Sequence, residues 1–153
     1  LNIAYYIFAQ NLYFDFATEF VSKTPSIAKA SDFVLSEEDF KAFTDFLVQK
    51  NFTYTSQTQK YYNELFEMAK IEGLDEVAKA EFASLKEKLL PDVRKNITDN
   101  KDEIAELLSL EIIKRYYFQK GEVEFSLRTD KALKTALEKM NDTVAMSEIL
   151  KTK

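Results

Sequence analysis

Residues that could act as nucleophiles are scarce in this chain, and one spacing stands out among them. Ser26-Ile27-Ala28-Lys29 has the Ser-x-x-Lys pattern of penicillin-recognising enzymes, in which the lysine activates the serine. Those enzymes also need a Lys-Thr-Gly strand, and the two glycines here follow Glu72 and Lys120 instead. The pattern is short and falls in an expected connector, so we interpret it as a chance match.

Three glutamates, Glu103, Glu106 and Glu111, fall in one predicted helix and could suggest a carboxylate metal site. Di-iron bundles pair such glutamates with a histidine three positions on, and this chain has no histidine. It also has no cysteine, which excludes thiolate nucleophiles, disulfides and Cys-ligated zinc. We therefore interpret the glutamates as a solvated face and expect no catalytic residue, metal ligand or cofactor site.

Aromatic side chains are the remaining candidates, because Phe and Tyr make up 14% of the chain. Aromatics at helical spacing pack into a core by default. A contact with another domain or a second copy of the chain stays open as the alternative. The candidate interface residues are Tyr5, Tyr6, Phe8, Tyr13, Phe16, Tyr116 and Tyr117.

The elements that must position these residues are predicted to be helices. The chain has two Gly and two Pro in 153 residues, whereas average usage would give about eighteen Gly and Pro together. This disfavours sandwiches, barrels and glycine-rich phosphate loops. The net charge of −5 has both signs interspersed, without the basic stripe of a nucleic-acid binder. The longest apolar run, Ile3 to Ala9, is far shorter than the roughly 20 residues that span a bilayer.

Apolar spacings of three and four predict an irregular all-α bundle of about six helices. The predicted helices cover residues 3–23, 37–50, 57–72, 75–97 with a kink or restart at Pro91, 101–120 and 131–140. Expected N-caps are Ser36, Thr55 or Ser56, Asp99 or Asn100, and Thr129 or Asp130, whereas Pro25, Gly73 and Gly121 are expected to end helices. In the helix from Asp75, core positions are predicted at Val77, Phe82, Leu85 and Leu89. Residues 52–54 and 122–127 are candidates for short extended pieces, and Met146, Ile149 and Leu150 for a final docking turn.

The order of several segments resembles a known family. The segments are residues 11–27, 33–54, 101–137 and 147–150, which together cover most of the chain. Their recurring features are Phe14-Asp15-Phe16-Ala17, the acidic helix start and Phe stripe from Ser36 to Phe46, Arg115-Tyr116-Tyr117 with the following Gly121, and Ser126-Leu127 with Asp130. With these features the chain resembles the helical C-terminal extension of bacterial carboxyl-terminal processing (tail-specific) serine proteases.

The resemblance implies a non-catalytic accessory domain, residues 1–153, in which residues 1–24 form a linking helix and residues 33–150 a helical body. In that family a Ser/Lys dyad in upstream domains, which include a PDZ domain, cleaves the peptide bond. Neither dyad segment is present here, so no catalytic residue carries over and the chain itself is not expected to be an enzyme. The implied setting is the bacterial periplasm, with or without association with the cell envelope.

The implied partners are the chain's own protease domain, a second copy, and unfolded or C-terminal-tail substrates bound by the parent enzyme. The expected role is to aid dimerisation or substrate access, and a free-standing helical interaction module is the alternative. Because the chain begins without Met inside an apolar pattern, we expect a piece of a longer protein or a processed form. Its first apolar segment covers more of a helix than one core face needs, which predicts self-association, most simply as a two-fold dimer.

Overall fold

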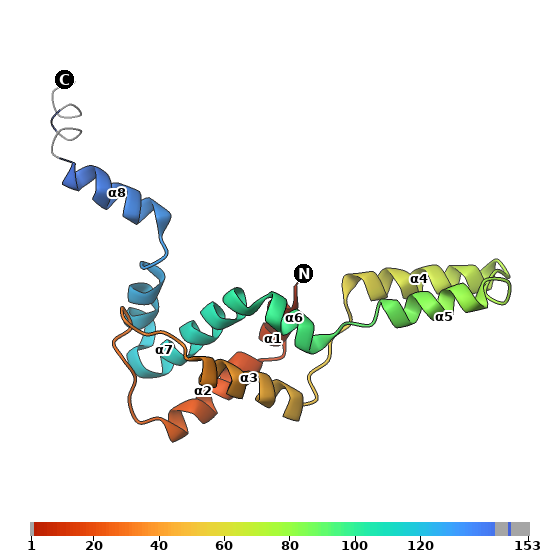
Figure 1. Cartoon of the computed structure of the whole chain (residues 1–153), viewed down its shortest axis with the longest axis horizontal. Helices are drawn as coiled ribbons and strands as arrows, with labels where there is room; N and C mark the ends of the chain where they lie inside the picture. Colours follow the sequence, from red (N-terminus) through yellow and green to blue (C-terminus); the bar gives the residue numbers. More distant parts are fainter. Residues whose placement is uncertain (1, 143–146, 148–153) are drawn as a thin grey trace. The chain divides into compact units, whose positions relative to one another are not determined.

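The computed structural model describes residues 2–142 and 147, and every regular element in this part of the chain is a helix (Figure 1). The predicted all-α class is confirmed, with eight helices in the described residues where about six were expected. They are α1 (Ile3–Ala9), α2 (Leu12–Lys23), α3 (Glu37–Gln49), α4 (Gln57–Ile71), α5 (Lys79–Lys88), α6 (Val93–Asp99), α7 (Lys101–Ser126) and α8 (Lys131–Asn141). Among the described residues, no helix combines the length and the apolar character needed to cross a membrane. The expected docking turn at Met146, Ile149 and Leu150 lies outside the described residues.

The chain divides into two compact units. Unit 1 contains Leu1–Phe16 and Leu35–Leu108, and unit 2 contains Ala17–Val34 and Ser109–Lys153. The divisions fall within the sequences of α2 and α7, so each unit is assembled from segments that are distant in sequence. Each unit is described by itself below.

The core of unit 1 is built around aromatic rings from α2 and α3. Phe43 is fully buried, with its ring centroid 5.4 Å from that of Tyr13 and 5.1 Å from that of Phe16. Phe46 completes the cluster at 5.5 Å from Phe16. The predicted Phe stripe of the acidic helix therefore faces the core. Ring pairs at these separations add attraction beyond the area that they bury.

The segment expected to form one helix from Ile3 to Lys23 consists of two helices, α1 and α2, and the expectation of a single helix is corrected. Asn11 lies between them with φ 59°, a left-handed conformation that Asn tolerates better than most residues. The N–H of Asn11 donates to the carbonyl of Phe8, and its own carbonyl accepts from Asp15 at 3.0 Å. Asn11 thus ends one helix and starts the next. The predicted stop before Pro25 is confirmed at Lys23.

Local capping signals place several of the other helix ends. Ser36 accepts from the N–H of Asp39, and Ser56 forms a reciprocal capping box with Gln59, which settles the choice between Thr55 and Ser56. Asp130 accepts from Leu133 and caps α8. Gly73 has φ 71°, and Leu74 N–H donates to Ala69 at 2.8 Å, which is the expected left-handed helix end.

Helices α4 and α5 lie side by side as a hairpin within unit 1 (yellow and green in Figure 1). Tyr62 and Phe66 of α4 pack with Phe82 of α5, and the Tyr62 hydroxyl donates to the Phe82 carbonyl at 2.8 Å. The predicted helix start at Asp75 is wrong, because residues 75–78 form turns and α5 begins at Lys79. Val77 and Leu85, predicted as core residues, are exposed, which corrects that prediction.

In unit 2, the second half of α7 packs against the connector between α2 and α3. Ile112 and Ile113 are fully buried, and Ala30 and Phe33 of the connector are buried as well. The hydroxyls of Tyr116 and Tyr117 donate to connector carbonyls, at Thr24 for the first and at Ile27 and Ala28 for the second. These bonds tie the connector to α7 within this unit.

Two predictions for the end of α7 are corrected. Gly121 does not stop the helix, and residues 122–127 are not extended, because helical structure continues to Ser126. The interruption is at Phe118 instead, where φ is 55° and ψ is −155°. A Cβ on Gly121 would lie 2.3 Å from Cβ of Tyr117, so glycine is needed here for a close approach of the chain to itself.

Candidate interaction surface

Helix α1 carries most of the predicted interface residues, and unit 1 holds this short helix from several sides. Asn2 caps it and donates from its side chain to Glu103, while Gln10 donates to the Thr53 carbonyl at 3.0 Å. Ile3 and Ile7 are fully buried on the inner side of the helix. Seven residues make fewer than two turns, so these tertiary contacts rather than helix propensity must stabilise α1.

The outer side of α1 presents two large aromatic rings. Tyr5 is 48% exposed and Phe8 is 64% exposed. Residues three apart lie next to each other on a helix surface, so the two rings form one apolar feature. No charged side chain occurs from residue 2 to residue 14. We name Tyr5 and Phe8 the α1 aromatic pair.

The other candidates in the N-terminal segment are used within unit 1. Tyr6 stacks on Tyr54 with centroids 4.7 Å apart, and the Tyr54 hydroxyl accepts from Asn96 at 2.6 Å. Tyr13 and Phe16 are buried in the ring cluster around Phe43. The structure therefore separates the predicted set: Tyr5 and Phe8 are available at the surface, whereas Tyr13 and Phe16 fill the unit's own core.

Tyr116 and Tyr117 belong to unit 2, and both are half-buried. Their hydroxyls are occupied by connector carbonyls, and their rings lie 6.5 Å apart. Burial raises the pKa of Tyr116 above its usual value of 10.0. These two tyrosines hold the connector in place and offer only part of their surface to a partner.

The residues whose types could take part in catalysis or metal binding lie at or near the surface. Ser26 and Lys29 are both exposed in the connector, so the pattern lacks the buried, desolvated environment in which a lysine activates a serine. Glu111 bonds Arg115 at 3.3 Å, and the side chain of Glu103 accepts from Asn2. Glu103 and Glu111 therefore have structural partners in their own units.

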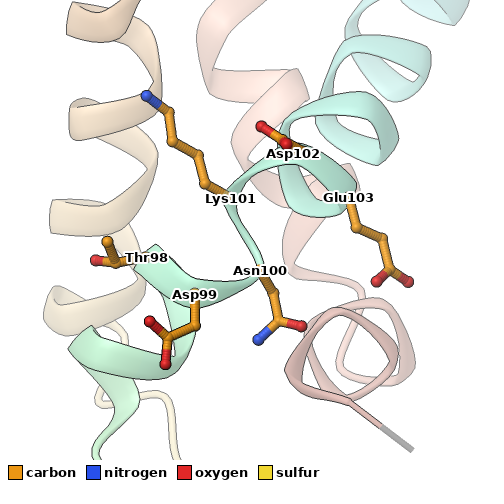
Figure 2. A pocket seen from close by; sticks show the side chains of 6 residues that line it. All are labelled: Thr98, Asp99, Asn100, Lys101, Asp102 and Glu103. Carbon is orange, nitrogen blue, oxygen red and sulfur yellow. The ribbon is translucent and has the colours of Figure 1, made fainter.

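The surface where α6 meets α7 contains a hollow of about 410 Å³ lined by residues 98–103. Figure 2 shows that its acidic side chains, Asp99, Asp102 and Glu103, point in different directions rather than toward one point. Lys101 extends away from them toward α3, where its ammonium meets Glu37 at 2.6 Å and lies 5.4 Å from the ring centre of Phe40. Without convergence, these carboxylates do not have the arrangement that binds a metal ion.

One apolar surface was missed by the sequence interpretation. Tyr61, Leu65 and Met68 on α4 are all more than half exposed, at spacings of four and three. The helix thus has two adjacent apolar stripes, of which the inner one packs on α5. The signal was present in the sequence as an apolar arc broader than one contact face needs. Unlike the α1 aromatic pair, this stripe lies in a helix that also carries Glu64 and Glu67.

Comparisons with known proteins identify a matching family. No curated protein and no solved structure is detectably similar to the chain. A family model described as "Probable PDZ-protease, C-terminal helical domain" matches residues 3–140. This range includes α1 to α7 and nearly all of α8, and it agrees with the resemblance found from the segments of the sequence. The chain belongs to the family of C-terminal helical domains of probable PDZ-proteases.

Proposed function

We propose that the chain is a non-catalytic accessory domain of a periplasmic carboxyl-terminal processing serine protease, and that it joins two copies of the enzyme through the α1 aromatic pair. Hydrolysis of unfolded or C-terminal-tail substrates belongs to a Ser/Lys dyad in upstream domains of the parent protein. Family membership supports the protease setting. The chain itself has no histidine or cysteine, and its one Ser-x-x-Lys pattern is exposed.

The single observation that carries the proposed contact is the exposure of Tyr5 and Phe8 on a helix whose opposite side is fully buried. In a two-fold contact each residue meets the same surface patch of the other copy, so a charged patch would repel itself. Residues 2–14 carry no charged side chain, so α1 itself brings no like charge to a contact with its own copy. Exposed aromatic rings also supply large contact area at low entropic cost.

The proposal is tested in the parent enzyme with the double substitution Tyr5→Lys and Phe8→Lys. We expect the purified enzyme to become monomeric and to process an unstructured substrate with an apolar C-terminus more slowly. The matched control is Tyr61→Lys with Leu65→Lys on α4, which adds the same charge to another exposed apolar surface. This control should leave both the mass and the processing rate unchanged.

Three results would contradict the proposal. The coding sequence upstream of Leu1 could lack PDZ and Ser/Lys protease regions, which would favour a free-standing interaction module. The enzyme could remain a dimer after the α1 substitutions, which would place the contact elsewhere. Finally, residues 1–153 alone could hydrolyse the substrate in a manner abolished by Ser26→Ala, which would make the domain catalytic.

A further inference from the structure

The bend at Phe118 places a bulky residue in a backbone conformation that is essentially restricted to glycine. Its φ of 55° and ψ of −155° differ from helical values on both angles. The Phe118 side chain is 75% exposed, so burial of its ring does not compensate for the strain. Such a conformation persists only when the surrounding structure imposes it. The contacts on either side of Phe118 must therefore hold the bend.

Contacts across the bend bring the two arms of α7 together. Gly121 lies so close to the first arm that a Cβ would be 2.3 Å from Cβ of Tyr117 and 2.9 Å from Cγ2 of Ile113. Lys114 and Glu122 form an ion pair at 3.1 Å. On a straight helix, residues eight apart are separated by about 12 Å along the axis, a span that Lys and Glu reach only with both side chains fully extended, so the bend favours this pair.

The connector between α2 and α3 contacts α7 before the bend and the turn that follows the end of α7. Before the bend, the Tyr117 hydroxyl donates to the carbonyls of Ile27 and Ala28, each at 3.1 Å. After the bend, Arg128 donates to the Phe33 carbonyl at 2.6 Å and stacks over the Phe125 ring at 4.9 Å. A segment of about ten residues thus bonds to the chain on both sides of the bend.

We propose that α7 is a two-state hinge at Phe118, and that the connector, residues 24–33, latches it in the bent state. In the straight state Phe118 adopts helical angles and its strain is relieved. Tyr117 and Gly121 then have ordinary helix spacing, with about 5–6 Å between β-carbons. Local backbone preference favours the straight state and the contacts of the connector favour the bent one. A partner that binds the connector and withdraws its carbonyls would release the latch.

The distance between spin labels on the two arms tests the hinge. The chain has no cysteine, so Leu110→Cys and Val123→Cys create two unique labelling sites. A straight helix separates these positions by about 20 Å. We expect pulsed electron resonance on the labelled 153-residue chain to give mainly a shorter distance, because Gly121 and Glu122 are folded back on the first arm.

Two substitutions should shift the distance distribution in opposite directions. Gly121→Ala introduces a β-carbon that the bent state cannot accommodate, and should produce a major population at about 20 Å. Phe118→Gly removes the backbone strain of the bent state and should leave only the short distance. Phe118→Ala is the matched control, because it removes the ring but keeps the β-carbon. Its short-distance fraction should be lower than that of Phe118→Gly.

Two milder changes keep the test decisive if Gly121→Ala prevents folding, which circular dichroism and thermal melting would show. Tyr117→Phe removes a latch hydroxyl, and Glu122→Lys repels Lys114, so both should enlarge the long-distance population. Adding Lys114→Glu to the second variant should restore the short distance. The proposal is overturned if the labelled chain without further substitutions already gives a distance of about 20 Å between the labels. It is also overturned if every folded variant keeps the short distance.

Discussion

Two tyrosines of unit 1 place their hydroxyls in very different surroundings. Tyr62 donates to the Phe82 carbonyl at 2.8 Å. Tyr13 is 3% exposed, and its hydroxyl has no hydrogen-bond partner within the described part of the chain. A buried polar group without a partner loses its hydration and gains nothing in return. The ring of Tyr13 therefore contributes to the core through its contact with Phe43, while its hydroxyl opposes folding.

Replacing Tyr13 with Phe should therefore stabilise the protein. Removal of the buried hydroxyl should raise the free energy of unfolding by about 1 kcal/mol, since the ring and its packing are retained. Tyr62→Phe is the matched control, because there the same change breaks a hydrogen bond and should lower that free energy by about 1 kcal/mol. Urea unfolding at neutral pH measures both. A clear loss of stability in Tyr13→Phe would show that its hydroxyl has a favourable interaction.

The same hydroxyl predicts a pH dependence. Burial, and next the negative charge of Glu103, raise the pKa of Tyr13 above its usual value of 10.0. The folded chain then keeps this proton at pH values where the unfolded chain has lost it. The contribution of Tyr13 to stability is complete below about pH 10 and is lost as the pH rises toward the folded pKa. The advantage of Tyr13→Phe should thus be larger at about pH 11 than at about pH 8, and equal values would contradict the shift.

At the scale of elements, several helix ends were predictable from sequence because a single residue supplies the local interaction. Ser36 and Asp130 accept from backbone N–H groups three residues on, and Gly73 supplies the left-handed helix end. These interactions lie within a few residues and depend little on the rest of the fold. The Phe stripe of α3 was predictable for the same reason, since helical periodicity alone places its rings on one side.

The capping box of α4 gives a prediction at this scale. Ser56→Ala removes an acceptor for the Gln59 N–H and should lower the free energy of unfolding by about 1 kcal/mol. The neighbouring Thr55→Ala should have little effect, because Thr55 is exposed and outside the box. Thermal or urea unfolding of the two variants side by side tests the assignment. Equal losses would mean that the two residues share the role.

Two helix interruptions could not be read from the sequence because contacts within each unit determine them. Asn11 ends α1 in a segment whose apolar spacing continues without a break. Phe118 bends α7 against its own backbone preference, and the connector that holds the bend is about ninety residues away in sequence. Gly121 is a typical helix-end residue, yet here it permits a close approach of the two arms. Backbone preference alone would have predicted the straight helix.

At the scale of the whole molecule, the sequence suggests a candidate surface but cannot tell which of its residues face outward. Tyr5, Phe8, Tyr13 and Phe16 all fit the apolar pattern of the first segment, and periodicity cannot tell which flank faces the core. The break at Asn11 starts a new helix, so the faces of α1 and α2 are set separately. As a result Tyr13 and Phe16 enter the ring cluster, whereas Tyr5 and Phe8 remain outside.

The residues 1–153 alone should therefore form a dimer through α1. Light scattering over a range of concentrations should give the mass of two copies. Tyr5→Lys with Phe8→Lys should give a folded monomer, since a two-fold contact would bring four ammonium groups close together in the dimer. Both side chains are already exposed, so neither change creates a cavity or buries a charge, and the circular dichroism spectrum should be unchanged.

Substitutions at the exposed apolar residues of α4 provide the control for this experiment. Tyr61→Lys with Leu65→Lys also places two cations on an exposed apolar helix surface. If charge alone prevented association, both double variants would be monomeric. If α1 forms the contact, only the α1 double variant will be monomeric, and the α4 double variant will retain the mass of a dimer. If the unsubstituted chain is already monomeric at high concentration, the proposed contact is refuted. If only the α4 variant is monomeric, the contact between copies lies on the α4–α5 hairpin instead.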